Sequence, residues 1–200
     1  PKAHSFDSVS NAIKNCSTTD TGKKSTKALR RTNQVPCVMY GGKGNVHFSA
    51  HARAFKDLFY KPEFSTAEIK IDGSSYTAFV KDSQFHPVTD ELLHVDFQEL
   101  VPGHTILTEI PIRLVGLAKG VKAGGKLNLK LRKLKVRTQA QYLVPEIVIN
   151  VEHLELSKSV RVRDVNIEGL EFVNPPAVPI ASVEITRALR AAAAAASKAS

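Results

Sequence analysis

Residues 84–97 read Gln84-Phe85-His86-Pro87-Val88-Thr89-Asp90-Glu91-Leu92-Leu93-His94-Val95-Asp96-Phe97, a turn around a proline followed by a regular alternation. After the turn, apolar and polar residues alternate over six positions: Leu93, His94, Val95, Asp96, Phe97 and Gln98. A two-residue period is that of a β-strand with one buried side and one side facing water. The polar side offers an imidazole, a carboxylate and an amide, which suits recognition by hydrogen bonds. Taken alone, the segment also fits a merely solvated strand.

The length of 200 residues allows one large domain or two domains of about a hundred residues each. The chain is 42% hydrophobic and 24% charged, which is the balance of a globular protein with a packed core. Its formal charge of +9 points toward a polyanionic partner.

The charge is unevenly distributed along the chain. Residues 14–56 hold nine basic residues and one acid, whereas residues 61–101 hold three basic residues and eight acids. Residues 113–137 hold nine basic residues and no acid. Two basic zones suit a protein that touches a polyanion at two places. In the second zone the candidate binding residues are Lys122, Lys126, Lys130, Arg132, Lys133, Lys135 and Arg137.

The first basic zone contains a predicted helix, Gly22-Lys23-Lys24-Ser25-Thr26-Lys27-Ala28-Leu29-Arg30-Arg31. At about 100° per residue, five cations fall within roughly 120° of its circumference. They are Lys23, Lys24, Lys27, Arg30 and Arg31. No acid is interleaved to stabilise this face by opposite-sign pairs, so the segment fits phosphate binding as well as a solvated charged helix.

The remaining patterns predict a mainly β (α+β) protein. Residues 35–40 read as a buried strand, residues 41–44 as the turn after it, and Asp72-Gly73 as the turn of a β-hairpin. Ser49 is a predicted N-cap for a helix over residues 52–59. Before residue 20 the pattern supports only a short edge strand.

The breaker Val101-Pro102-Gly103 predicts a domain boundary. We therefore expect an antiparallel, barrel-like β domain over residues 1–101 and a mainly antiparallel β domain over residues 102–188. In the second domain the alternation of leucines slips by one residue at Lys133, which predicts a bulge or a turn. Residues 189–200 form an alanine-rich tail, which we expect to fray.

The sequence predicts neither an enzyme nor a cofactor or metal site. Cys16 and Cys37 lack CxxC spacing, the histidines lack HxxxH spacing, and no nucleophile elbow is present. No stretch approaches the roughly 18 apolar residues of a membrane span, and no signal-peptide pattern opens the chain. We expect a soluble, cytoplasmic protein with reduced thiols.

Several stretches in combination resemble a known family. They are Gly22-Lys23-Lys24 with Lys27-Ala28-Leu29-Arg30, Val35-Pro36-Cys37-Val38-Met39-Tyr40-Gly41-Gly42, Lys81-Asp82-Ser83-Gln84-Phe85-His86-Pro87 and Leu93-His94-Val95-Asp96-Phe97. The family is the bacterial large-subunit ribosomal protein that binds 5S rRNA, in its long two-domain form, also called the CTC or general stress protein family. Residues 115–127 are similar to the second-domain signature of that form: Val115-Gly116-Leu117-Ala118-Lys119-Gly120-Val121-Lys122-Ala123-Gly124-Gly125-Lys126-Leu127. The resemblance covers about residues 20 to 190.

The resemblance implies a six-stranded, barrel-like N-terminal domain that docks on the loop E region of 5S rRNA, and a mainly β C-terminal domain. The family's RNA contacts carry over to Lys23, Thr26, Lys27, Arg30, Tyr40, Gln84, His94 and Asp96. The predicted RNA-binding set is completed by their neighbours Lys24, Lys81 and His86. One departure is that residues 15–21 lack the basic residue that the family often has before the glycine, so a phosphate contact there is either missing or supplied by Lys14.

We expect a structural component of the large ribosomal subunit. The second basic zone is assigned to neighbouring 23S rRNA or large-subunit proteins, and no small-molecule substrate or membrane partner is expected. Two alternatives are a stress-associated RNA-binding protein acting off the ribosome and a general module that recognises acidic proteins.

Overall fold

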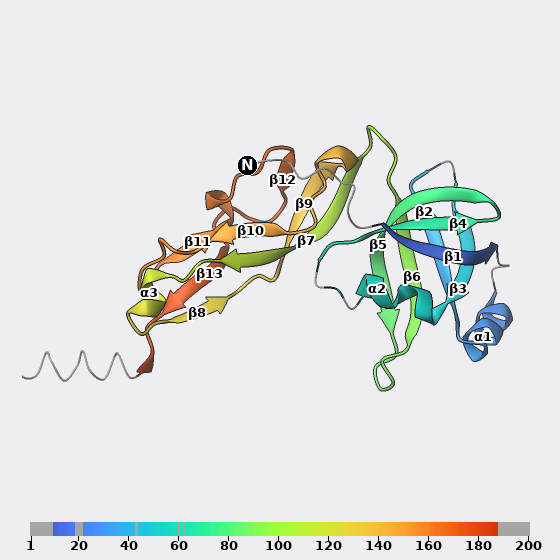
Figure 1. Ribbon diagram of the computed structural model, residues 1–200, viewed down its shortest axis with the longest axis horizontal. Helices are drawn as coiled ribbons and strands as arrows, with labels where there is room; N and C mark the ends of the chain where they lie inside the picture. The colour runs from blue at the N-terminus through green and yellow to red at the C-terminus, as the bar shows by residue number, and fades with distance from the viewer. Residues whose placement is uncertain (1–9, 19–21, 43, 60, 62, 188–200) are drawn as a thin grey trace, which may run out of the picture. The chain divides into compact units, whose positions relative to one another are not determined.

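The computed structural model describes residues 10–18, 22–42, 44–59, 61 and 63–187 (Figure 1). Strands dominate, and the helices are short. The predicted fold class is therefore confirmed. Among the described residues, no helix reaches the length and apolar character that crossing a bilayer requires. The predicted tail at residues 189–200 lies outside the described residues.

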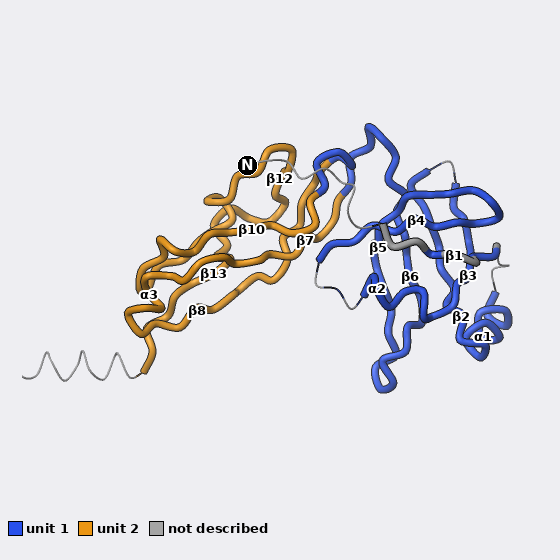
Figure 2. Tube along the Cα trace, in the orientation of Figure 1, with its two compact units in different colours: residues 1–106, 139–143 blue, residues 107–138, 144–200 orange. Residues whose placement is uncertain are grey.

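The chain forms two compact units (Figure 2). The first unit comprises residues 1–106 with 139–143, and the second comprises residues 107–138 with 144–200. The structural division falls after Ile106, near the start of strand β7 (Thr105–Val115). The boundary predicted from the sequence, between residues 101 and 102, lies a few residues before it.

The first unit is a closed barrel of six strands, in the order β1-β3-β2-β6-β5-β4. Its strands are β1 (Ser10–Thr18), β2 (Gln34–Tyr40), β3 (Val46–His51), β4 (Thr66–Ile71), β5 (Ser74–Phe85) and β6 (Leu92–Glu99). The hairpin of β4 and β5 turns at Asp72 and Gly73, both with positive φ, as predicted. The first strand is not an edge strand, because a closed barrel has no edge.

The direction of two strand pairs differs from the prediction. The prediction of an antiparallel barrel was wrong for β1 with β4 and for β2 with β6, which pair in parallel. The alternation of side chains is the same in both directions, so it could not reveal them. The parallel pair matters for the site, because it places Val38 beside Asp96 and Tyr40 beside Gln98.

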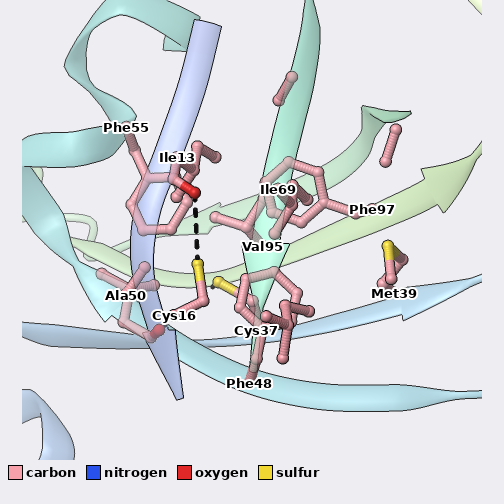
Figure 3. Packing of buried hydrophobic residues seen from close by; sticks show 14 of the residues in the cluster. Ile13, Cys16, Cys37, Met39, Phe48, Ala50, Phe55, Ile69, Val95 and Phe97 are labelled. Atoms are coloured by element: carbon pink, nitrogen blue, oxygen red, sulfur yellow. Dashed lines mark hydrogen bonds between the residues drawn. The ribbon is translucent and has the colours of Figure 1, made fainter. Parts of the chain in front are cut away.

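The interior of the barrel is filled by side chains from every strand (Figure 3). The ring of Phe97 lies 5.8 Å from that of Phe48 and 6.2 Å from that of Phe55, measured between centroids, and all three rings are buried. Cys16 and Cys37 are free thiols in this core, and the Cys16 thiol donates to the carbonyl of Ile13. The strand that carries the polar residues is thus anchored by a tightly packed apolar side.

The helices of the first unit are α1 (Lys23–Arg31), the 3-10 helix η1 (Ala52–Phe55) and α2 (Lys56–Phe59). The predicted N-cap at Ser49 was wrong, because Ser49 lies within β3 and pairs with Pro36. His51 caps η1 instead, since its Nδ1 accepts from the amide of Arg53 at 3.3 Å.

The second unit contains two sheets. One has the order β10-β7-β9-β12, and the other β11-β13-β8. The further elements of this unit are α3 (Lys119–Lys122), β8 (Lys126–Leu129), β9 (Lys133–Gln139), β10 (Ile147–Asn150), β11 (Ser159–Arg161), η3 (Val162–Asp164), β12 (Leu170–Phe172) and β13 (Pro179–Glu184). The 3-10 helix η2 (Ala140–Tyr142), which follows β9, belongs to the first unit. The slip at Lys133 is where the chain passes from one sheet to the other, since β8 and β9 belong to different sheets.

Candidate nucleic-acid interface

Helix α1 separates its cations from its packed side. The five predicted cations are all exposed, whereas Ser25, Thr26 and Leu29 are half-buried on the other side of the helix. The Thr26 hydroxyl donates to the carbonyls of Gly22, at 3.0 Å, and Lys23, at 3.2 Å. Thr26, which the resemblance implies as an RNA contact, thus already uses its hydroxyl hydrogen within the first turn of the helix.

The C-terminus of α1 is well capped, although the rest of the helix has little to hold it. The Thr32 hydroxyl donates to the carbonyl of Leu29, and Asn33 ends the helix in the left-handed region with φ of 56°. No side chain of α1 is buried, and no acid lies in its first turn. Each like-charge pair three or four residues apart costs about 0.2–0.5 kcal/mol, so a polyanion would stabilise this helix.

The α1 cations lack acidic partners across the described part of the chain. No carboxylate of a described residue lies within ion-pair distance of any of the five, which are Lys23, Lys24, Lys27, Arg30 and Arg31. Ammonium and guanidinium groups without internal partners are available to phosphates. The side chain of Lys14 lies outside the described residues.

The outer face of β6 presents His94, Asp96 and Gln98, as the alternation predicts, while Val95 and Phe97 are buried. One detail differs: Phe85 pairs with Leu92 and Gln84 with His94, so Leu93 is an extra, bulged residue. Because of the bulge, Leu92 packs against the barrel core in place of Leu93.

Two neighbouring strands extend this polar face. On β5, Gln84 lies opposite His94 and Asp82 lies opposite Asp96. The sequence prediction included Gln84 but missed Asp82, because only the irregular register at Lys81 places the two carboxylates opposite each other. Like charges directly opposite on adjacent strands are destabilising, so this pair does not add to the stability of the barrel.

The ring of His94 is held by Asp96. Its Nδ1 lies 2.7 Å from Oδ1 of Asp96, and both side chains are about one-third exposed, 30% and 32%. A contact this short to a carboxylate requires a hydrogen on Nδ1. The opposite ring nitrogen, Nε2, is therefore left to interact with a ligand, together with the second oxygen of Asp96.

Tyr40 is the last residue of β2 and pairs with Gln98 on β6, two residues after Asp96. Burial raises the pKa of its phenol above the ordinary value of 10.0, and the carboxylates of Asp96 and Asp82 raise it further. The hydroxyl consequently stays protonated and able to donate at neutral pH. The next residue, Gly41, has φ of 106°, a conformation that favours glycine, and a Cβ there would lie 3.4 Å from the carbonyl oxygen of Glu99 at the end of β6.

His86 organises the turn between β5 and β6. Its Nδ1 accepts from the amides of Val88, at 3.3 Å, and Thr89, at 3.2 Å. The turn is closed by hydrogen bonds between the backbones of His86, Asp90 and Glu91. The structure thus gives His86 a local role in shaping the loop, while Lys81 is exposed at the irregular position of β5.

A single side-chain hydrogen bond connects α1 to β6. The guanidinium Nε of Arg30 donates to the carbonyl oxygen of Leu93 at 3.2 Å. The carbonyl belongs to the peptide group that also contains the amide nitrogen of His94. The cationic helix and the polar strand face are therefore adjacent. This adjacency is needed if one surface is to carry Lys27, Arg30, Gln84, His94 and Asp96.

The residues of the second basic zone are divided among α3, β8, β9 and their connections, and β8 and β9 belong to different sheets. Three of its cations are paired with acids that are distant in sequence. The pairs are Lys130 with Glu184 at 2.8 Å, Lys135 with Glu109 at 3.7 Å and Arg137 with Glu171 at 3.4 Å. The others, Lys122, Lys126, Arg132 and Lys133, are exposed and have no ion pair with a described residue. The zone is thus less available to a polyanion than the sequence suggests.

Comparison with known proteins accounts for almost the whole chain. Residues 11–97 match the model of the Ribosomal L25p family, and residues 105–187 match that of the ribosomal protein TL5 C-terminal domain. The chain belongs to the Ribosomal L25p family. Within that family it is similar to proteins named large ribosomal subunit protein bL25.

Three bL25 relatives illustrate the extent of the similarity. The Phocaeicola vulgatus protein is 44% identical over 93% of this chain and 98% of its own length. The Bacteroides fragilis protein is 45% identical, with 88% of this chain and 89% of the relative covered. The Porphyromonas gingivalis protein is 42% identical, with 86% and 91% covered. The chain is therefore a two-domain member of this family of structural, non-enzymatic ribosomal proteins.

Proposed function

We propose that this L25-family protein is a structural component of the large ribosomal subunit whose barrel unit binds 5S rRNA at its loop E region. The observation that carries the proposal is the adjacency of two unlike surfaces. One is the cationic face of α1, which lacks acidic partners among the described residues, and the other is the polar face of β6 with its His94–Asp96 pair.

The cationic face supplies affinity. Lys23, Lys27 and their neighbours on α1 contact phosphates and release counterions from the RNA. Such contacts fix the orientation of the protein on the RNA but carry no direct sequence information. Their contribution to the binding constant falls steeply as the salt concentration rises.

The polar face supplies selectivity. Asp96 would be repelled by phosphates, so it favours binding only where it accepts hydrogen bonds from base amino or imino groups or from a ribose hydroxyl. Gln84 and His94 have the same short reach. A regular A-form helix hides its major-groove edges, whereas RNA with noncanonical pairs exposes them. This set of residues consequently suits an irregular target such as loop E.

The second unit would contact neighbouring 23S rRNA or large-subunit proteins. Lys122, Lys126, Arg132 and Lys133, which have no ion pair with a described residue, can meet phosphates, whereas Lys130, Lys135 and Arg137 already have acidic partners. A mixed surface of this kind is suited to binding protein as well as RNA.

The test is a titration of the full chain against 5S rRNA and against an RNA of equal length and composition with a scrambled sequence. We expect a clear preference for 5S rRNA that persists at higher salt. Equal affinity for both, collapsing with salt, would leave a merely basic protein and overturn the proposal. If the protein does not co-sediment with salt-washed large subunits from cell lysate, the result would instead favour the stress-associated role off the ribosome.

A further inference from the structure

Arg30 differs from the other cations of α1. Among the described residues, Lys23, Lys24, Lys27 and Arg31 make no side-chain hydrogen bond to the barrel, whereas Arg30 Nε donates to the Leu93 carbonyl on β6. The bond spans 63 positions in sequence and joins α1 directly to β6, in addition to the indirect connection through β2. The two terminal nitrogens of the guanidinium are not used by this bond.

The acceptor is in a special place. Leu93 is the bulged residue of β6, between the pairs Gln84–His94 and Phe85–Leu92. The paired positions of β2 and β6 begin only at Cys37 and Val95, so this stretch of β6 has no paired position on β2. The peptide group that Arg30 holds includes the amide nitrogen of His94. Its orientation therefore affects the direction in which the His94 ring leaves the strand.

Helix α1 has few other constraints. It buries no side chain, carries only like charges and spans nine residues, a length at which an isolated helix is unstable. It is connected to β2 through Thr32 and Asn33. The cap at these residues fixes the end of the helix, and among the described residues the Arg30 bond is the side-chain hydrogen bond that joins the helix to β6.

We infer that Arg30 is a positioning residue for RNA recognition. It holds the cationic face of α1 and the His94–Asp96 pair in a fixed position relative to each other. The inference rests on the proposed function. A phosphate ligand would contribute alike to any RNA, because phosphate contacts carry no direct sequence information. A positioning residue acts through the geometry of its Nε bond, so that its loss lowers selectivity even where the charge is kept.

Arg30→Lys separates these roles, because it keeps the charge and removes the guanidinium geometry. Arg31→Lys is the matched control, since Arg31 is the exposed neighbour on the same turn. In the free full-length protein we expect Arg30→Lys to shift the ring NMR signals of His94 and to speed amide exchange in α1. Arg31→Lys should change neither. Unchanged His94 signals in Arg30→Lys would overturn the inference without any RNA present.

The second readout compares intact 5S rRNA with a 5S rRNA in which loop E is replaced by Watson–Crick pairs. We expect Arg30→Lys to reduce the preference for the intact RNA by about fivefold, the factor that corresponds to one net hydrogen bond, at an unchanged salt slope. Equal weakening toward both RNAs would indicate a general structural role and overturn the inference. No preference in the unmodified protein would overturn the proposed function, and this inference with it.

Discussion

The Nδ1 atom of His94 and the Oδ1 atom of Asp96 lie 2.7 Å apart on the outer face of β6. Because the side chains are two residues apart on one strand, they project from the same face. The carboxylate holds a hydrogen on Nδ1, so Nε2 is the ring nitrogen that this contact leaves for a ligand. In the proposed function, the pair would act as one preorganised recognition element.

We expect Asp96→Ala to release the His94 ring from this state, and Asp96→Asn to retain it. The amide oxygen of asparagine can still accept from Nδ1, whereas alanine offers no acceptor. The measurement is the pair of ring-nitrogen chemical shifts of His94 in the free protein. Identical shifts in the unmodified protein and the Asp96→Ala variant would show that Asp96 does not control the ring.

Several features of this site could be predicted from the sequence, because they depend on local periodicity. The five cations on one side of α1 and the alternation of β6 follow from spacing alone. The features that were missed depend on contacts between distant segments. The bulge at Leu93 and the register that brings Asp82 opposite Asp96 are set by strand pairing, and the Arg30–Leu93 bond joins two elements.

The second unit shows the same limit. A run of nine cations without an acid between residues 113 and 137 predicted one basic surface. The fold brings Glu109, Glu171 and Glu184 from outside the run to three of these cations, and the chain changes sheet at Lys133. The net charge of residues 113–137 therefore overestimated the number of cations that have no acidic partner among the described residues.

The buried thiols predict a loss of stability at alkaline pH. Burial raises the pKa of Cys16 from its ordinary value of 9.0 to about 11, and burial, Cys16 and Asp96 raise that of Cys37. Above pH 9 the unfolded chain loses a proton that the folded chain keeps, so the free energy of unfolding falls as the pH rises from about 9 to about 11. Urea unfolding across this range should show a smaller fall for Cys16→Ala than for the unmodified protein. Parallel curves would contradict this account.

Gly120 should be intolerant of a side chain. A Cβ there would lie 2.7 Å from the backbone of both Glu155 and Leu156 and 2.9 Å from Val183 Cγ1. We expect Gly120→Ala to destabilise the second unit by about 1–3 kcal/mol, because backbone atoms cannot easily move aside. Amide hydrogen exchange of strands β8 and β13 measures the effect. Lys122→Ala, exposed on the same short helix, is the control and should change it by less than about 0.5 kcal/mol. Equal protection in both variants would contradict the close packing.

The central claim is that α1 supplies affinity and the β6 face supplies selectivity, and salt-dependent binding to 5S rRNA tests it most directly. Lys27→Ala should lower the slope of log binding constant against log salt by about 0.9 and keep the preference for intact loop E. Asp96→Ala should keep the slope and lose the preference. Lys135→Ala, whose ammonium faces Glu109, is the matched control and should change neither. Equal slopes for Lys27→Ala and Asp96→Ala, with equal loss of preference, would contradict this division between the two surfaces.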